Sequence, residues 1–366
     1  MADSLTLEVD RADPALRRVV EEPLPDALSD GEVLLAVDRF ALTANNMTYA
    51  LVGDSIGYWR FFPTNDDRWG RIPAMAYADV IASAHPEVRV GERVWGFFPM
   101  GTHLRINAGK IHETAFSDVS PHRDGLAPVY AQFQRAATNP IHEAGREEQD
   151  CLLRGLFLTS WLCEDALHDE DYYSAGDCVI TSASSKTSIA LAFAIKERGK
   201  LRAIGLTSAG NAEFCRGLGC YDRVLTYDDI DELPRDRSAM LVDMAGNGAL
   251  NAAIHAHYAN QLRYDCRIGV THRDAPPAES KDLSGPRPQM FFAPKQAQKR
   301  GQEWGPLVLE QRLASAFARF REFADSWLEV RRFDGREAAD RAFGEVLEGR
   351  APPQAGYSVS LSDSAS

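Results

Sequence analysis

The segment from Cys178 to Lys196, CVITSASSKTSIALAFAIK, constrains most strongly what this chain can fold into. A short apolar run leads into a cluster of small hydroxylic residues and then into an alanine-rich stretch with helical spacing. A buried strand, a tight turn and a helix begin a βαβ unit, and such a turn presents backbone N–H groups that can bind a phosphate. The segment therefore predicts the start of a parallel sheet.

The turn itself departs from the usual dinucleotide-binding pattern. The common Gly-x-Gly-x-x-Gly is missing, and Ser182, Ser185 and Ser188 stand at every third position, with Lys186 between them. Serine still allows a helix to pack closely on a strand, and its hydroxyl can donate to a phosphate. It does not tolerate a positive φ as glycine does. The turn alone is therefore equally consistent with a dinucleotide site and with an ordinary strand–helix junction.

Composition excludes several classes of partner. The chain has 366 residues, enough for two domains, and a formal net charge of −13. Nucleic acids and anionic membranes bind basic surfaces, so neither is an expected partner. There is no charged-then-apolar leader and no apolar run of roughly 18–20 residues, so we expect a cytoplasmic protein. The six cysteines form no Cys-x-x-Cys pair and are expected to be buried, reduced thiols.

The first third of the chain is rich in predicted β-structure. Residues 1 to about 125 contain short apolar runs, such as 33–37 and 80–84, punctuated by glycine and proline, which is typical of an irregular barrel or sandwich. Between these two runs lies an aromatic-rich segment over 43–63, TANNMTYALVGDSIGYWRFFP. This segment is either a hydrophobic plug for the end of the barrel or the wall of a substrate pocket.

The second half alternates between strand and helix patterns. Expected strands include 202–207, 223–225, 239–243 and 266–270. Such alternation predicts a mostly parallel sheet with right-handed crossovers. A helix is expected over 152–167 before the sheet, and a helix over 307–323, a strand over 327–332, a helix over 335–347 and a strand over 357–361 after it.

This order of segments resembles the medium-chain dehydrogenase/reductase superfamily. The matching segments are GEVLL (31–35), VGERVWG (90–96), LTSW (158–161), LGCYDRV (218–224) and VDMAG (242–246). The resemblance implies an α/β protein with a GroES-like β-barrel catalytic domain and a doubly wound, Rossmann-type domain. The implied boundaries are a barrel over 1–145, completed by about 325–366, a nucleotide-binding domain over 146–295, and C-terminal helices and strands over 296–366 that return to the barrel.

Within this superfamily the chain resembles the zinc-free quinone-oxidoreductase branch. The segments NNMTYA, GYWRFFP, SASSKT and FFAP further resemble an uncharacterised bacterial and fungal family placed beside that branch. Zinc-dependent members have a Gly-His-Glu where this chain reads Pro73 to Tyr77, and nothing in the sequence has the residue types and spacing of a zinc site. We therefore expect no metal.

The resemblance also bears on the cofactor. It places an Ala-x-x-Gly-x-x-Gly turn on the three serines, so either a pyrophosphate binds slightly farther out or nucleotide binding has been lost. After the second strand no acid stands ready to repel a 2′-phosphate, which favours NADP(H) over NAD(H). The expected cofactor-binding residues are Thr159, Ser184, Ser185, Lys186, Thr187, Thr207, Ser208, Asn211, Ala245, Gly246, Thr271 and His272.

The expected chemistry is hydride transfer in a pocket between the sheet's carboxyl edge and the barrel. Hydride transfer to an enone or other carbonyl compound leaves negative charge on the substrate oxygen, which needs a hydrogen-bond donor and then a proton. Without zinc, Tyr49 or Tyr58 is the expected donor and Asn46 the positioning residue. For each tyrosine, packing in the core is the alternative. The sequence therefore favours a zinc-independent NADP(H)-dependent oxidoreductase that acts on an enone, quinone or other small carbonyl compound.

Two alternatives keep the fold without the redox role. One is a lyase or hydratase with Lys186 or Tyr58 as the acid–base group, and the other is a small-ligand binder with a degenerate cofactor site. Relatives of this fold commonly form dimers by pairing sheet edges, so the resemblance also implies a homodimer.

Overall fold

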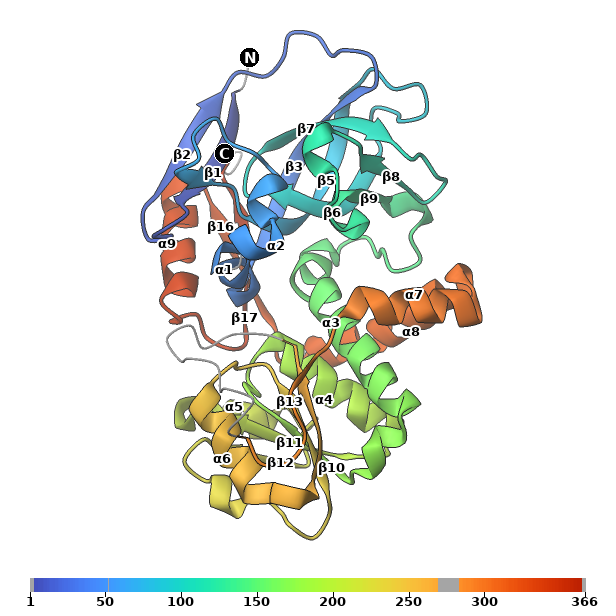
Figure 1. The fold of residues 1–366 in the computed structure, drawn as a ribbon. Coiled ribbons are helices and arrows are strands. Elements are labelled where there is room, and N and C mark those ends of the chain that lie inside the picture. Colours follow the sequence, from blue (N-terminus) through green and yellow to red (C-terminus); the bar gives the residue numbers. More distant parts are fainter. Residues whose placement is uncertain (1–2, 52, 269–282, 364–366) are drawn as a thin grey trace. The chain divides into compact units, whose positions relative to one another are not determined.

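The computed structural model describes residues 3–51, 53–268 and 283–363 (Figure 1). Its internal contacts divide the chain into two compact units. The first unit consists of Met1–Leu152 and Leu328–Ser366, and the second of Leu153–Trp327. Each unit buries its own cluster of apolar side chains, as separate domains do.

The first unit is built on a closed β-barrel. Its strands lie in the order β3–β5–β6–β9–β8–β7, and β7 pairs back with β3 to close the ring. The barrel strands are β3 (Glu32–Leu42), β5 (Pro73–Ser83), β6 (Arg93–Pro99), β7 (His103–Gly109), β8 (Ala115–Asp118) and β9 (Gln132–Arg135). The predicted GroES-like barrel is confirmed.

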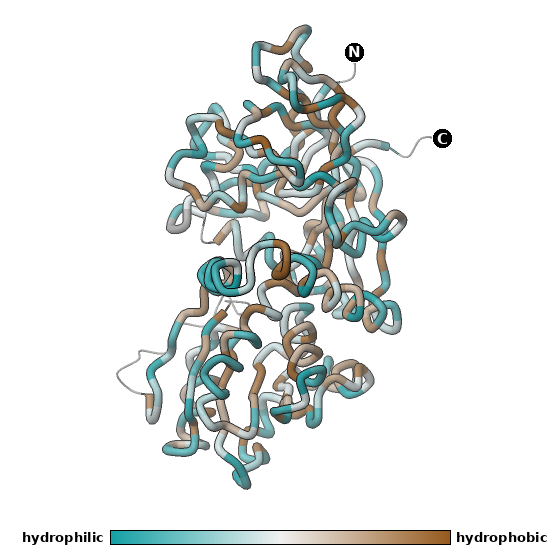
Figure 2. Tube along the Cα trace, turned by 90° about the vertical axis from the view of Figure 1, so that its right-hand side faces the viewer, coloured by the Kyte–Doolittle hydropathy of each residue, from teal (hydrophilic) through white to brown (hydrophobic). Residues whose placement is uncertain are grey.

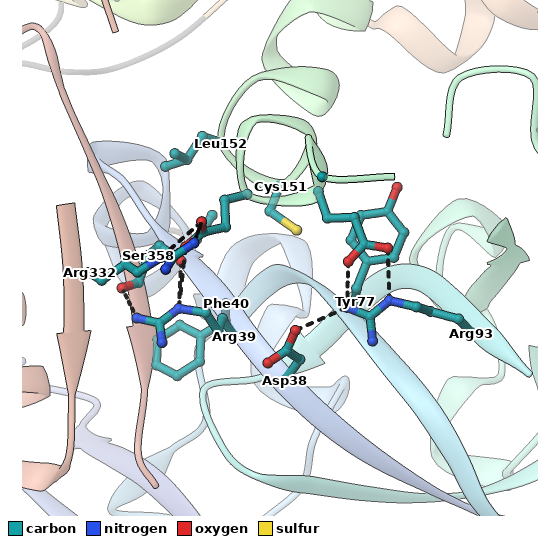
Figure 3. A pocket seen from close by; sticks show the side chains of 13 residues that line it. Asp38, Arg39, Phe40, Tyr77, Arg93, Cys151, Leu152, Arg332 and Ser358 are labelled. Carbon is teal, nitrogen blue, oxygen red and sulfur yellow. Dashed lines mark hydrogen bonds and ion pairs between the residues drawn. The ribbon is translucent and has the colours of Figure 1, made fainter. Parts of the chain in front are cut away.

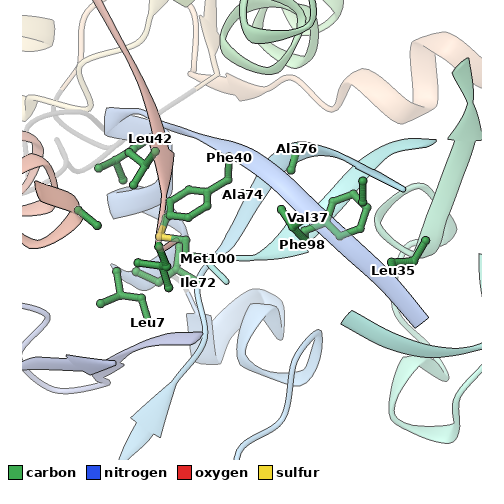
Figure 4. Packing of buried hydrophobic residues seen from close by; sticks show 14 of the residues in the cluster. Leu7, Leu35, Val37, Phe40, Leu42, Ile72, Ala74, Ala76, Phe98 and Met100 are labelled. Carbon is green, nitrogen blue, oxygen red and sulfur yellow. The ribbon is translucent and has the colours of Figure 1, made fainter. Parts of the chain in front are cut away.

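Alternation along the strands fills the barrel. Val33, Leu35 and Val37 of β3 are buried and belong to the same core as Ala76 of β5 and Phe98 of β6 (Figure 4). Because successive residues of a strand point to opposite faces, one face of β3 supplies this set of side chains. Alanines on β5 leave space for the large rings, so the barrel interior is a packed core.

The remaining elements of the first unit surround the barrel. β1 (Ser4–Asp10), β2 (Arg17–Glu22) and β4 (Trp69–Gly70) form a small antiparallel sheet. β17 (Ala355–Ser360) extends the barrel sheet beside β3, and β16 (Glu329–Asp334) pairs in parallel with β17. The helix α9 (Arg336–Leu347) connects β16 to β17. The predicted strand, helix and strand at the end of the chain are confirmed.

The aromatic-rich segment folds into short helices rather than a loop. These are α1 (Ala44–Leu51), α2 (Gly53–Ile56) and η1 (Tyr58–Arg60). The second half of the barrel carries three further short turns, η2 (Pro121–Arg123), η3 (Pro128–Ala131) and η4 (Ala136–Thr138).

The second unit contains a six-stranded parallel sheet in the order β12–β11–β10–β13–β14–β15. The strands are β10 (Asp177–Ile180), β11 (Arg202–Thr207), β12 (Arg223–Thr226), β13 (Ala239–Asp243), β14 (Leu262–Arg267) and β15 (Gln289–Met290). This is the doubly wound order, in which the direction of succession reverses between β10 and β13. The predicted Rossmann-type domain is confirmed.

Helices complete the second unit. They are α4 (Lys186–Arg198), α5 (Ala212–Gly217), α6 (Gly248–Tyr258), α7 (Ala293–Trp304), α8 (Pro306–Ala324) and the greater part of α3 (Glu147–Asp169). Phe320 of α8 packs on Phe157 of α3 and Phe193 of α4, with ring centroids 4.9 and 5.3 Å away. Figure 1 shows α7 and α8 side by side, and Arg300 of α7 binds Asp165 of α3 at 2.6 Å.

Hydropathy along the chain agrees with two packed cores. Apolar stretches are short and interrupted by hydrophilic residues (Figure 2). Within the described ranges, no helix combines the length and apolar character needed to cross a membrane. All six cysteines are free and buried, as predicted.

His255 of α6 is buried and connects three segments of the second unit. Its Nε2 lies 2.9 Å from Asp265 Oδ2, and its Nδ1 lies 2.6 Å from the carbonyl oxygen of Ser284. Both partners accept hydrogen bonds, so both ring nitrogens must carry protons. Burial lowers the pKa of His255, but the hydrogen bonds to Asp265 and Ser284 outweigh it, and the net pKa lies above its usual value.

This protonation state predicts how stability depends on pH. The stability that His255 contributes is fully present below its unfolded pKa of about 6.5 and is lost as the pH rises through the higher folded value. We expect the difference in free energy of unfolding between the wild type and His255→Gln, measured with urea, to be largest near about pH 6 and to shrink toward about pH 9. A difference that grows with pH would contradict the charged assignment.

Candidate functional site

The first group of predicted residues lies in the second unit, where β10 ends and α4 begins. We call residues 181–188 the serine turn. Ser182 has a φ of 50°, in the left-handed region that favours glycine, and hydrogen bonds to Tyr227 hold it there. Gly205 on the neighbouring strand β11 is required, because an added Cβ would lie 2.8 Å from the Ala183 Cβ. The turn therefore packs tightly on β11 even though it contains no glycine.

Two of the three serines stabilise the turn itself. Ser185 is the N-cap of α4, and its Oγ accepts from the Ser188 N–H at 3.1 Å. The Ser185 hydroxyl donates to Ser188 Oγ at 2.8 Å, and Ser188 in turn donates to the carbonyl oxygen of Thr181 at 2.9 Å. These bonds replace part of the N–H surface that a glycine turn leaves open to a ligand.

Ser184 is different, because its hydroxyl can still donate to a ligand. Its Oγ accepts from Asn211 Nδ2 at 3.1 Å and lies 3.5 Å from Thr207 Oγ1. A hydroxyl has one proton to give, and among the described residues we find no acceptor for it. The structure thus brings together three predicted cofactor-binding residues from the ends of β10 and β11. Ser208, also predicted, is exposed beside them.

Lys186 and Thr187 are the first two residues of α4. Lys186 is half-buried, and burial lowers its pKa to about 8. The helix dipole disfavours a cation at a helix N-terminus and favours an anion there. The position of Lys186 is therefore best explained if an anion binds beside it. The Thr187 carbonyl accepts from Ser160 Oγ at 2.8 Å, which fixes α4 to α3. Thr159 donates within α3 to the carbonyl of Gly155 at 3.1 Å, so its hydroxyl is engaged in its own helix.

Ala245 and Gly246 lie just after β13, beside the serine turn. The N–H groups of both residues donate to Asp243 Oδ1, at 2.9 and 3.1 Å. Thr181 Oγ1 donates to the same carboxylate at 2.9 Å, so Asp243 links the ends of β10 and β13. The predicted residues Thr271 and His272 lie outside the described residues.

The second group of predicted residues lies in the first unit. Tyr49 and Tyr58 belong to a set of five rings, Tyr49, Tyr58, Phe61, Phe97 and Tyr130, which we call the aromatic cluster. Neighbouring ring centroids around this set are 4.8, 5.2, 5.0, 4.9 and 6.2 Å apart. Burial raises the pKa of both predicted tyrosines well above the usual value, which keeps their hydroxyls protonated at neutral pH.

Asn46 is buried and uses both ends of its amide within the fold. Its Oδ1 accepts from the Thr43 N–H at 2.7 Å, and its Nδ2 donates to the Pro73 carbonyl at 2.9 Å. These bonds tie the start of α1 to β5. Asn45, its neighbour, hydrogen-bonds Tyr49. Asn46 thus positions the segment that carries Tyr49, while its amide is occupied by backbone groups.

Tyr130 and Phe97 are the residues of the aromatic cluster that sequence reasoning missed, and Tyr130 is the one with a hydroxyl. It lies in η3, and its hydroxyl oxygen is 3.2 Å from that of Tyr58. No local motif around Tyr130 signals this role, because the contact depends on the closure of the barrel. Buried Arg123 of η2 supports the same region by stacking on Phe62, 4.9 Å from the ring centroid.

A polar cavity of about 380 Å³, which the sequence did not predict, also lies in the first unit (Figure 3). Its charged side chains are bound to one another. Arg93 donates to Glu147 at 2.8 Å and to Asp79 at 2.9 Å, and Arg332 donates to Glu148 at 2.7 Å. Burial raises the pKa of Glu147, but Arg93 and His142 outweigh it and lower the pKa. These pairs anchor the first turn of α3 in the barrel unit.

No group of three or more His, Cys, Asp or Glu side chains within the described ranges could hold a metal ion. The candidate functional groups are a serine turn with a half-buried lysine in the second unit and a tyrosine-rich cluster in the first unit.

Solved structures with this fold include one in complex with NADPH, one in complex with NADP and an enoyl thioester reductase. CurA from Vibrio vulnificus in complex with NADPH has a TM-score of 0.62 at 14% identity, over 98% of this chain and 99% of that chain. A mutant enoyl thioester reductase from Candida tropicalis has a TM-score of 0.58 at 11% identity, over 98% of this chain and 100% of that chain. The YhdH oxidoreductase from Salmonella enterica in complex with NADP has a TM-score of 0.54 at 16% identity, over 98% of each chain.

These likenesses show the fold alone, which combines a β-barrel unit with a unit built on a doubly wound parallel sheet. No curated protein matches the sequence. The chain belongs to the family described as "Protein of unknown function (DUF2855)", which matches residues 40–352.

Proposed function

We propose that this protein is a zinc-independent, NADP(H)-dependent oxidoreductase that reduces an enone, quinone or other carbonyl compound by hydride transfer. The observation that carries the proposal is the donor left on Ser184, held by Asn211 beside Thr207 at the carboxyl edge of a doubly wound sheet. That edge is where such sheets bind nucleotides. Lys186 supplies positive charge a few residues away.

The same residues support NADP(H) over NAD(H). Ser208 and Asn211 offer a hydroxyl and an amide donor after the end of β11, where NAD-specific folds place an acid on the ribose. Two solved structures with this fold are complexes with NADPH and with NADP, which supports the same choice of cofactor. When bound, the cofactor would supply the hydride.

The first unit would supply the substrate site and the proton. Aromatic walls with a few polar groups are typical of small-molecule sites, and the aromatic cluster has this character. A buried tyrosine hydroxyl stays protonated and can donate to the oxygen on which negative charge develops. In the proposal, a tyrosine of the aromatic cluster, which includes the predicted Tyr49 and Tyr58, makes this donation, and Asn46 fixes the segment that carries Tyr49.

A second candidate is a lyase or hydratase that uses no nucleotide. It is favoured by the cap that Ser185 places on the Ser188 N–H, because a phosphate would compete with that hydroxyl. In this reading Lys186 or Tyr58 is the acid–base group.

The two candidates are separated by a turnover assay on the purified protein. NADPH oxidation would be followed with a panel of enones and quinones in the presence of a metal chelator. The proposal predicts NADPH-dependent turnover that the chelator leaves unchanged. Conversion of a carbonyl compound without nucleotide would instead favour the lyase or hydratase, and chelator-sensitive reduction would contradict zinc independence.

A further inference from the structure

The hydroxyl groups of Tyr58 and Tyr130 form an unequal pair in the first unit. Their oxygens are 3.2 Å apart, and their rings meet edge to face at 5.6 Å. Tyr58 is only 6% exposed, whereas Tyr130 is half-buried. Within such a pair one hydroxyl donates and the other accepts, so the accepting residue keeps its own proton for a third partner.

The surroundings decide which residue donates. Tyr58 is enclosed by the rings of Tyr49, Phe61 and Tyr130, at 4.8, 5.2 and 5.6 Å. An apolar enclosure disfavours the tyrosinate, so Tyr58 keeps its proton and is best suited to donate it as a hydrogen bond. Tyr130 then accepts from Tyr58, and its own O–H is the one that a ligand can reach.

The ring of Tyr130 is also held in place. Phe61 and Phe97 contact it at 5.0 and 4.9 Å, at interplanar angles of 37° and 72°. Contacts from two rings in different orientations leave little freedom for Tyr130 to turn. A fixed donor with a satisfied oxygen is what proton transfer to a bound substrate requires.

We propose that Tyr130 is the proton donor of the reduction and that Tyr58 is its positioning residue; this rests on the proposed function. After the hydride reaches the β-carbon of an enone, the substrate is an enolate. The Tyr130 O–H bond breaks and its proton goes to the enolate, which completes the saturated carbonyl product. The Tyr130 phenolate accepts the Tyr58 hydrogen bond and is then reprotonated by water. The substrate gains two electrons and one hydrogen from the reduced nicotinamide, and one proton from solvent.

Two matched variants, Tyr130→Phe and Tyr58→Phe, test the assignment. Loss of a general acid typically costs about 10²–10⁴-fold in rate. We expect Tyr130→Phe to lower kcat by this factor while the Kd for NADPH stays within about twofold of the wild type. Tyr58→Phe should lower kcat by about tenfold, since it removes one hydrogen bond to the phenolate. Its KM should stay within about twofold of the wild type, because the lost hydrogen bond acts on proton transfer and not on substrate binding.

The outcomes separate this inference from the function on which it rests. If the wild type turns over NADPH, the proposed function holds. The assignment of Tyr130 would still be overturned if Tyr130→Phe kept a kcat near that of the wild type, or if Tyr58→Phe lost more kcat than Tyr130→Phe. A wild type without reductase activity would overturn both. The Kd for NADPH gives a readout besides activity, because a variant that binds NADPH more than about twofold more weakly would indicate a structural role and overturn the assignment.

Discussion

Asp243→Ala is expected to destabilise the second unit by about 3–5 kcal/mol, because it leaves several hydrogen-bond donors of the interior without their acceptor. Asp243 is fully buried at the end of β13. Its carboxylate accepts hydrogen bonds from Thr181 Oγ1 at 2.9 Å, the Ala245 N–H at 2.9 Å, the Gly246 N–H at 3.1 Å and Asn251 Nδ2 at 2.6 Å. Each buried donor left without a partner costs about 1–3 kcal/mol. Urea unfolding followed by circular dichroism measures the loss.

Asp228 offers a matched control, because it is an exposed aspartate in the same unit. Asp228→Ala should stay within about 0.5 kcal/mol of the wild type. A loss below about 1 kcal/mol for Asp243→Ala would mean that this carboxylate does not hold the ends of β10 and β13 together.

Lys186→Ala is expected to weaken NADPH binding by about 10- to 100-fold, the loss of roughly 1.4–2.8 kcal/mol from a charge-assisted hydrogen bond. Lys186 begins α4 and is half-buried, so few other positions could bring a cation to a phosphate at the serine turn. Lys200→Ala is the control, since Lys200 is exposed just beyond the other end of α4. Isothermal titration calorimetry gives both affinities.

The same lysine makes affinity depend on pH. Burial lowers the pKa of Lys186 to about 8, so the charged form is lost as the pH rises through that value. NADPH affinity of the wild type should therefore fall across this range, and the fall should be absent in Lys186→Ala. Unchanged affinity in the variant, with catalytic turnover abolished, would favour the lyase or hydratase role for Lys186.

Much of the fold could be predicted because its signals are local. The apolar run at 178–181, the small residues after it and the helical spacing beyond identify β10, the serine turn and α4 from neighbouring residues alone. The alternation that follows then requires a parallel sheet. The aromatic-rich segment was harder, since it folds into the short helices α1, α2 and η1, whose residues pack on one another rather than repeat with a clear period.

The candidate site was only partly predictable because its contacts join distant residues. Tyr130 meets Tyr58 across 72 positions of sequence. Nor does the residue type of Ser185 reveal whether its hydroxyl faces a phosphate or caps its own helix, and the structure shows the cap. Ser184, by contrast, accepts a hydrogen bond from Asn211, which follows the end of the next strand.

The most direct test of the account is calorimetric titration of the purified protein with NADPH and then, separately, with NADH. The serine turn, with Ser184 as donor and Lys186 as cation, predicts micromolar binding of NADPH and binding of NADH weaker by about tenfold or more. Absence of heat with either nucleotide, confirmed by unchanged thermal stability in their presence, would contradict the account. It would identify the three serines as the remnant of a lost cofactor site.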